Sequence, residues 1–287
     1  MSRWVGVLVG TAAGLYIAVP LILKRVLAPP RRDGSRTPSD LGLPQERVWL
    51  ESVNGTRLHG WFIPVEARAP AVVVVHGWGG NAALMLPLAP HLHEAGFHAL
   101  FLDARNHGLS ENDSFVSMPR FAEDVESASR WLRAHPAVTS VGVIGHSVGA
   151  GAAILSASRG DLFDAVVSVA APARPGDLIR DQMSRIPEPL LAGVLAAIQR
   201  IIGSRFESFA PRNRIGLVTA PILLVHGDAD PVVPIDNLYE LRAAQPAAEV
   251  LVVPNGDHTG IERLEHHMGE VVDFLDRHLR PDGPERL

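Results

Sequence analysis

The fold of this chain is decided by residues 141–149, which read VGVIGHSVG. Apolar residues 141–144 predict a buried β-strand, and the Ala- and Gly-rich run 148–158 predicts a helix. Ser147 therefore stands in a Gly-x-Ser-x-Gly pattern between a strand and a helix. Such a sharp turn exposes the serine hydroxyl above a sheet, and side chains at the flanking glycines would clash with the neighbouring strand and helix. The alternative is a Gly-rich turn with an ordinary serine.

Strand and helix patterns alternate on both sides of this turn. The predicted strands are residues 47–53, 57–64, 71–75, 98–102, 141–144, 165–169, 222–225 and 249–253. Asn54-Gly55 joins the first two and is a strong hairpin signal. The predicted helices are residues 81–95, 119–134, 148–158, 235–244 and 261–279. Short apolar strands alternating with helices predict an α/β fold, with a mostly parallel eight-stranded sheet covered on both faces.

Composition excludes several classes of protein. With 287 residues, 47% of them hydrophobic, the chain can bury a full core. A net charge of −5 without a basic stripe argues against a nucleic-acid partner. The chain has no cysteine, which excludes disulfides, thiolate metal sites and a cysteine nucleophile. No His-Glu-x-x-His motif occurs either, so we predict no metal site, and the chemistry inferred below needs no cofactor.

The N-terminal residues differ in composition from the rest. Residues 4–23 carry no charged side chain, and a helix of this length would span the roughly 30 Å hydrocarbon core of a bilayer. We therefore predict an N-terminal membrane helix, a signal anchor, over residues 1–27. The positive charges that follow it predict a single-pass protein whose remaining part faces the cytoplasm. The alternatives are a cleaved signal peptide, with secretion of the rest, or a buried helix.

Two further segments complete the predicted domain organisation. Residues 28–46 are rich in Pro, Gly, Ser and charge, which predicts a flexible linker ahead of a domain over residues 47–287. About fifty residues between 169 and 222 carry no strand signal, and residues 177–184 and 190–202 are helix-like. Loops this long are usually lids or insertions, so we predict a helical cap over about residues 172–215. The alternative is a helical excursion that only packs on the core.

Five motifs together resemble one known family. They are HGWGGN at 76–81, DARNHGLS at 103–110, GHSVG at 145–149, HGDADPVVP at 226–234 and GDH at 256–258. In this order they resemble the α/β-hydrolase superfamily, in particular its serine-hydrolase branch of lysophospholipase-like and prolyl-aminopeptidase-like proteins with a short cap. The resemblance covers residues from about 47 to 280. It implies an α/β-hydrolase fold and a catalytic triad in the order serine, acid, histidine.

The candidate triad is Ser147, Asp230 and His258. A serine hydroxyl becomes a strong nucleophile only when a neighbouring imidazole takes its proton, and His258 follows the last strand in a Gly-rich loop. Asp230 follows the strand 222–225 and would hold the correct tautomer of His258. Asp228, two residues away, is the alternative acid, although the resemblance implies the second aspartate of Gly-Asp-x-Asp. His146, at the x position of the turn, is expected to be a packed or hydrogen-bonded neighbour.

An oxyanion hole needs two backbone N–H groups aimed at the developing negative charge. The amide of Val148, directly after Ser147, is the first candidate. The resemblance implies that the amide of Trp78, in the loop after the strand 71–75, is the second. It also implies a structural role for the loop 103–110, where Asn106 replaces the family's usual glycine.

These residues predict a serine hydrolase that cleaves a carboxylic ester or thioester through an acyl-enzyme on Ser147. The expected partner is a small-molecule acyl ester, and the predicted membrane helix suggests a lipid-like one. The same triad would also serve an acyltransferase or a peptidase. From a different class, the chain could be a membrane-tethered binding protein without catalysis, but such a protein would not need a serine paired with a histidine.

Overall fold

The computed structural model describes residues 28–32, 34, 36–258 and 261–280. In this part of the chain eight strands form one sheet, in the order β1-β2-β4-β3-β5-β6-β7-β8. β1 and β2 form an antiparallel hairpin, β2 pairs antiparallel with β4, and all other neighbours are parallel. The predicted mostly parallel eight-stranded sheet is confirmed. The strand bounds are β1 Glu46–Glu51, β2 Arg57–Ile63, β3 Ala69–Val75, β4 His98–Leu102, β5 Val138–His146, β6 Ala165–Val169, β7 Ile222–Gly227 and β8 Glu249–Val253.

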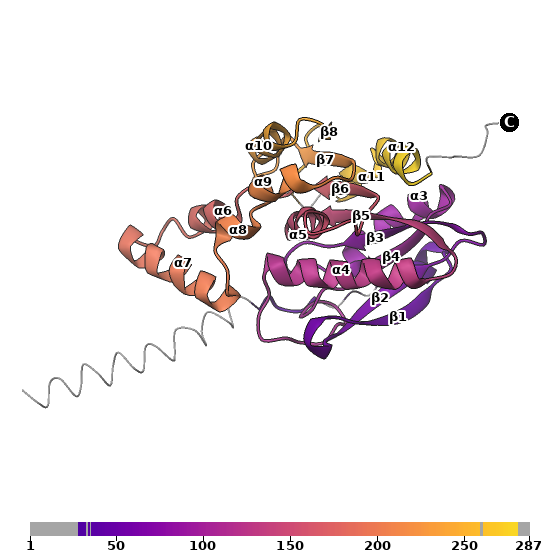
Figure 1. Cartoon of the computed structure of the whole chain (residues 1–287), viewed down its shortest axis with the longest axis horizontal. Helices are drawn as coiled ribbons and strands as arrows, with labels where there is room; N and C mark the ends of the chain where they lie inside the picture. Colours follow the sequence, from indigo (N-terminus) through magenta and orange to yellow (C-terminus); the bar gives the residue numbers. More distant parts are fainter. Residues whose placement is uncertain (1–27, 33, 35, 259–260, 281–287) are drawn as a thin grey trace, which may run out of the picture.

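Helices cover both faces of this sheet (Figure 1). Alternate residues of β3 point to opposite faces, as strand geometry requires: Val73 and Val75 belong to one apolar cluster, and Val72 and Val74 to the other. The first cluster includes residues of α4 (Met118–Ala134), α5 (Val148–Ala157) and α10 (Asp236–Ala244). The second includes residues of α2 (Ala82–Met85), α3 (Ala89–Glu94), α11 (Ile261–Glu265) and α12 (Met268–Leu279).

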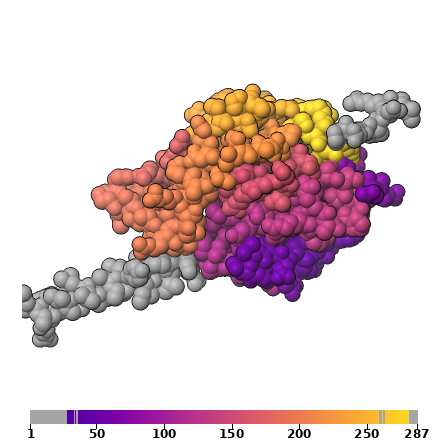
Figure 2. All heavy atoms as spheres, viewed as in Figure 1, coloured from indigo at the N-terminus to yellow at the C-terminus, as the bar shows by residue number. Residues whose placement is uncertain are grey.

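The segment between β6 and β7 is helical, and its first helices project from the sheet. It contains α6 (Pro175–Gln182), α7 (Glu188–Ile202), α8 (Phe206–Phe209), α9 (Pro211–Arg214) and the 3-10 helix η4 (Ile215–Leu217). Figures 1 and 2 show α6 and α7 as a lobe beside the main body. Leu191, Leu195 and Ile198 of α7 are buried and belong to the first apolar cluster, so the lobe is anchored by one face of this helix.

Two predicted helices are interrupted in the structure. Residues 81–95 form α2, the 3-10 helix η3 (Leu86–Leu88) and α3 instead of one helix, because Pro87 and Pro90 lack the N–H that a continuous helix needs. The closing helix is divided at His266 and His267 into α11 and α12. The amide of His267 donates to the Leu264 carbonyl at 2.8 Å, which ends α11 in a tighter turn.

The segment predicted as a flexible linker is packed on the domain in the residues that the structure describes. Pro38–Leu41 form the 3-10 helix η1, and Asp40 accepts hydrogen bonds from the amide and hydroxyl of Thr37 at 2.7 and 2.9 Å. Pro38 is buried, and Leu41 and Leu43 pack against the second apolar cluster. A composition typical of linkers therefore did not predict these few apolar anchors.

The fold-class prediction needs one correction, which concerns the membrane. Across the described ranges, no helix is both long and apolar enough to cross a bilayer, so a transmembrane helix is not supported. The residues for which it was predicted, 1–27, lie outside the part of the chain that the structure describes. Hydropathy reports only how apolar a segment is, and the same signal fits a signal peptide or a buried helix.

Candidate active site

Ser147 occupies a strained turn between a strand and a helix. β5 ends at the residue before it, and α5 begins at the residue after it. Its backbone has φ 54° and ψ −118°, a region that residues with a side chain rarely adopt. The amide of Ser147 donates to the Val169 carbonyl at 2.8 Å, and the Ser147 carbonyl accepts from Gly151 at 3.0 Å. Hydrogen bonds to strand β6 and to helix α5 thus hold Ser147 in this conformation.

The two glycines that flank this turn are required by close backbone approach. A Cβ added to Gly145 would lie 2.4 Å from the Gly149 carbonyl oxygen, and one added to Gly149 would lie 2.5 Å from the His76 carbonyl oxygen. Both distances are far inside van der Waals contact, and the atoms met are backbone. The predicted clashes with the neighbouring helix and strand are confirmed. Gly77 allows a similar approach, since its Cβ would lie 3.0 Å from the Ser147 Cβ.

The structure brings the three predicted triad residues together, although they are far apart in the sequence. His258 Nε2 lies 3.0 Å from Ser147 Oγ, and His258 Nδ1 lies 2.7 Å from Asp230 Oδ2. An ionised carboxylate only accepts hydrogen bonds, so Nδ1–H donates to Asp230 and Nε2 is left to accept from the serine hydroxyl. This tautomer is the one in which an imidazole can remove the proton from a serine.

Asp230 is held in an environment that keeps it ionised. Its side chain is fully buried, and Oδ1 accepts hydrogen bonds from the amides of Val232 and Val233, both at 2.8 Å. Burial raises the pKa of Asp230, but the hydrogen bonds from His258 and from these amides outweigh it, so the pKa lies below its ordinary value. The carboxylate is therefore charged at neutral pH.

The other candidate acid, Asp228, has a different partner. Its Oδ1 accepts the amide of Asn255 at 2.6 Å, which ties the loop after β7 to the loop that carries His258. The two loops approach so closely that a Cβ on Gly227 would lie 2.2 Å from the Gly256 carbonyl oxygen. Asp230, rather than Asp228, is the aspartate in contact with His258.

His146 is a hydrogen-bonded neighbour of the triad, as its position predicts. Its Nε2 lies 2.8 Å from the carbonyl oxygen of His258, to which it donates, and the two imidazole rings are 5.1 Å apart. Desolvation lowers the pKa of His146 to about 4, so the ring is neutral near pH 7. The residue therefore links the serine turn to the backbone of the histidine loop.

The two predicted oxyanion donors lie on either side of this turn. Val148 is the first residue of α5, so its amide belongs to the helix N-terminus directly after Ser147. Trp78 lies in the loop that follows β3, next to Gly77, whose close approach to the Ser147 Cβ is given above. Trp78 is 43% exposed, so this loop presents an apolar surface to solvent.

A hydrogen bond that the sequence did not predict holds the loop that follows β3. The Gly79 amide donates to Nε2 of His107 at 3.1 Å, while Nδ1 of His107 donates to the Arg105 carbonyl at 2.8 Å. Desolvation lowers the pKa of His107 to about 3, which leaves Nε2 free of a proton and able to accept. The motif at 103–110 indicated only a structural loop, and nothing local in it names Gly79 as the partner.

Asn106, which replaces the family's usual glycine, adopts φ 65°. Asparagine tolerates the left-handed region better than most residues, which explains how the turn survives the replacement. The Asn106 amide donates to the Glu111 carbonyl at 3.0 Å, and its side-chain oxygen accepts the Asp113 amide.

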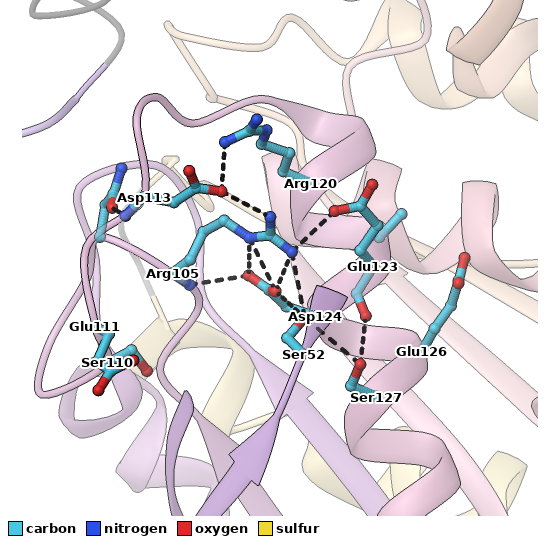
Figure 3. Close-up of polar contacts among 12 residues, drawn as sticks. Ser52, Arg105, Ser110, Glu111, Asp113, Arg120, Glu123, Asp124, Glu126 and Ser127 are labelled. Atoms are coloured by element: carbon cyan, nitrogen blue, oxygen red, sulfur yellow. Dashed lines mark hydrogen bonds and ion pairs between the residues drawn. The ribbon is translucent and has the colours of Figure 1, made fainter. Parts of the chain in front are cut away.

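A second buried polar cluster surrounds Arg105 in the same loop (Figure 3). The Arg105 side chain is fully buried, and its Nη2 lies 2.7 Å from Asp124 and 2.9 Å from Glu123. Nη1 lies 3.1 Å from Asp113, and Nη2 also donates to the Ser52 hydroxyl at 3.2 Å. This cluster joins β4, α4 and the β1–β2 hairpin through charge-assisted hydrogen bonds.

No group of three or more His, Cys, Asp or Glu side chains in the described residues is arranged to hold a metal ion.

A comparison with known protein families assigns the chain to one of them. The family model described as the alpha/beta hydrolase fold matches residues 70–190 and 179–262. These ranges include the strand–serine–helix turn, both aspartates and His258. The chain therefore belongs to the α/β-hydrolase fold family.

Individual relatives agree with this assignment. The chain is 31% identical to the uncharacterised protein YfhR of Escherichia coli K12 over an alignment of 259 positions that covers 83% of each chain. It is 28% identical over 146 residues, 49% of this chain and 48% of the other, to the polyketide transferase ATR5 of Stachybotrys chlorohalonatus. The Pyrococcus furiosus esterase Pf2001 superposes with a TM-score of 0.72 at 23% identity, covering 88% of this chain and 98% of that one. At this identity the likeness concerns the fold.

Proposed function

We propose that the chain is a serine hydrolase that cleaves a carboxylic ester or thioester through an acyl-enzyme on Ser147. The observation that carries the proposal is the unbroken hydrogen-bond chain from Ser147 Oγ through His258 to the ionised Asp230. A merely structural serine would need neither this chain nor a backbone at φ 54°. Membership of the α/β-hydrolase fold family is consistent with this chemistry.

The proposed reaction has two halves. Ser147 Oγ attacks the carbonyl carbon while His258 Nε2 takes its proton, and the amides of Val148 and Trp78 stabilise the oxyanion. The imidazolium, stabilised by Asp230, then gives the proton to the departing alcohol or thiol as the bond to the acyl carbon breaks. In the second half, water gives a proton to His258 while its oxygen attacks the acyl carbon. His258 then returns the proton to Ser147 Oγ as the bond between Oγ and the acyl carbon breaks, which releases the acid.

Esters and thioesters are preferred over peptides because their leaving groups depart with less help. Trp78, in the loop after β3, and Val232, whose amide donates to Asp230, are 43% and 41% exposed. Such apolar surfaces suit an apolar acyl group.

The test uses a fluorophosphonate probe and a series of p-nitrophenyl acyl esters on the full-length chain. Ser147→Ala should abolish labelling and lower kcat by about 10⁴- to 10⁶-fold, the loss typical of a missing nucleophile. Ser168→Ala is the control, because the Ser168 hydroxyl is buried and has no hydrogen-bond partner in the described residues. It should label and turn over like the wild type. Turnover retained by Ser147→Ala, or a folded wild type that neither labels nor hydrolyses, would reject the proposal.

Acyl transfer is the second candidate, favoured by the similarity to the polyketide transferase ATR5 over about half of each chain. It would use the same acyl-enzyme, with an alcohol, thiol or amine in place of water. Product analysis in the presence of a small alcohol separates the two candidates. A hydrolase releases mainly free acid, whereas a transferase forms mainly the new ester.

A further inference from the structure

The segment that precedes β1 reaches the loops of the candidate active site. We call residues 28–32 the N-terminal strap. Pro29 in the strap is buried, and its Cβ lies 3.9 Å from the point where a Cβ on Gly79 would stand. Gly79 is the residue after Trp78, so the strap lies against the loop of the proposed oxyanion donor.

Arg31 makes the main polar contacts of the strap. Its Nη1 donates to the Gly108 carbonyl at 2.5 Å, and its Nη2 donates to the Ser110 carbonyl and to Asn112 Oδ1, the latter at 2.7 Å. The planar, forked guanidinium can reach three acceptors at once, which a single ammonium group cannot do with the same geometry. One side chain of the strap thereby fixes three positions of the loop 103–112.

That loop in turn holds the oxyanion loop. His107, one residue before Gly108, accepts the Gly79 amide at 3.1 Å. Asp103 accepts the amides of Ala82 and Leu109, at 2.7 and 3.0 Å, and so joins the two loops at a second point. The positive charge of Arg31 adds to the desolvation that lowers the pKa of His107, which is consistent with their proximity.

The strap also contacts the far end of the oxyanion loop. The side-chain amide of Asn81 donates to the Arg32 carbonyl at 2.9 Å, and the side-chain oxygen of Asn81 caps α2 by accepting the Leu84 amide at 3.1 Å. The loop 76–81 is therefore held through His107 on one side and through the strap backbone on the other.

From these contacts we infer that Arg31 is a positioning residue for the reaction, acting through the loop 103–112 and His107 on the amide of Trp78. The inference rests on the proposed function, because it assigns Arg31 to the geometry of the oxyanion hole. Loop segments without regular secondary structure open locally at little cost unless side chains hold them. A displaced donor stabilises the transition state less, and complete removal of one typically costs about 10²–10³ in kcat.

The test compares three full-length variants: Arg31→Met, Arg31→Lys and the control Arg32→Met. Arg32→Met makes the same charge change one residue away, but Arg32 contacts Asn81 through its carbonyl, which any residue retains. We expect Arg31→Met to lower kcat about tenfold, below the loss for a removed donor, with little change in KM. Arg31→Lys should recover only part of kcat, and Arg32→Met should behave like the wild type.

Hydrogen–deuterium exchange provides a readout that does not depend on turnover. Peptides covering residues 76–81 and 104–112 should exchange faster in Arg31→Met than in Arg32→Met, at a temperature at which both are folded. Equal exchange in the two variants would overturn the inference, whatever the activity. Faster exchange with unchanged kcat would overturn the positioning role and leave a structural contact. A wild type without Ser147-dependent turnover would instead reject the proposed function, and the exchange result would still report whether the strap holds the loop.

Discussion

Two polar clusters in the described part of the chain, the triad and the group around Arg105, differ in how their buried charge is partnered. In the Arg105 cluster the guanidinium is fully buried and contacts three carboxylates, Asp113, Glu123 and Asp124. In the triad the side chain of Asp230 is equally buried, but that of His258 is 13% exposed and contacts the half-buried Ser147. The buried guanidinium of Arg105 is surrounded by carboxylates of opposite charge, of which Asp124 is fully buried and Asp113 and Glu123 are partly exposed, whereas the buried carboxylate of Asp230 leads through an imidazole to the hydroxyl of Ser147.

This difference indicates separate roles: the Arg105 cluster contributes to stability, and the triad serves the proposed catalysis. Each buried charge in the Arg105 cluster has its opposite charge beside it, and moving a proton there would leave a charge unpaired. The triad instead places one ionised carboxylate behind the imidazole of His258, so that in the proposed reaction a proton taken from Ser147 creates a favourable ion pair. Buried charge alone therefore does not mark the active site. What distinguishes the candidate active site is the hydrogen-bond chain from a buried carboxylate to the half-buried hydroxyl of Ser147.

The largest expected effect comes from a substitution of Asp230, the buried end of the triad. Asp230→Asn keeps the shape but favours the wrong tautomer of His258, and we expect kcat to fall by about 10⁴-fold, equivalent to about 5.4 kcal/mol of activation free energy. Asp228→Asn is the matched control, because an amide oxygen can still accept the Asn255 amide. Steady-state kinetics with a p-nitrophenyl ester checks both variants. A larger loss for Asp228→Asn would move the acid to that residue.

The next largest effect is expected from a variant that breaks the Arg105 cluster. It should lower the free energy of unfolding more than it lowers turnover. Arg105→Met leaves the fully buried Asp124 without its counter-charge, and removing one partner of a buried pair typically costs about 3–5 kcal/mol. Urea unfolding should show this loss, while the kcat of the folded variant should fall far less than that of Asp230→Asn. The double variant Arg105→Met/Asp124→Asn should cost less than the sum of the single changes. Additive losses, or a loss of kcat comparable to that of Asp230→Asn, would contradict the contrast between the clusters.

The smallest expected effect concerns the edge of the Arg105 cluster and depends on pH. Burial raises the pKa of Asp113, but hydrogen bonds from the Ser114 amide and from Arg120, together with the charge of Arg105, lower it overall. A lowered pKa contributes stability above the unfolded-state pKa of about 3.9, and this stability is lost as the pH falls through the folded-state pKa. Asp113→Asn should therefore cost on the order of 1 kcal/mol at pH 7, and progressively less in acid.

Glu123, in the same cluster, has a pKa that is shifted in the opposite direction. Burial raises its pKa by more than the charge of Arg105 lowers it. A raised pKa contributes stability that is present below the unfolded-state pKa of about 4.3 and is lost as the pH rises through the folded-state pKa. Glu123→Gln should thus cost less than Asp113→Asn at pH 7. Urea midpoints measured from pH 3 to pH 7 distinguish the two trends, and parallel curves for both variants would contradict them.

Much of the candidate site could be predicted from the sequence because its motifs are local. The turn around Ser147 needs glycines at fixed offsets, and each strand that ends in a functional loop is a short apolar run. The sequence alone does not decide which aspartate is the acid of the triad, because Asp228 and Asp230 follow the same strand. Their partners, Asn255 and His258, lie in one loop only three residues apart, so only the fold of that loop decides which aspartate meets the imidazole.

The sequence by itself determined the α/β architecture, the order of the strands along the chain and the identity of the serine turn, because periodicity and turn chemistry act over a few residues. Only the tertiary structure decided that Asp230 meets His258, that His107 supports Gly79, and that the supposed linker packs against the active-site loops. These contacts join residues between 28 and 77 positions apart. No local pattern specifies such pairings, since they depend on how the sheet edge brings separate loops together.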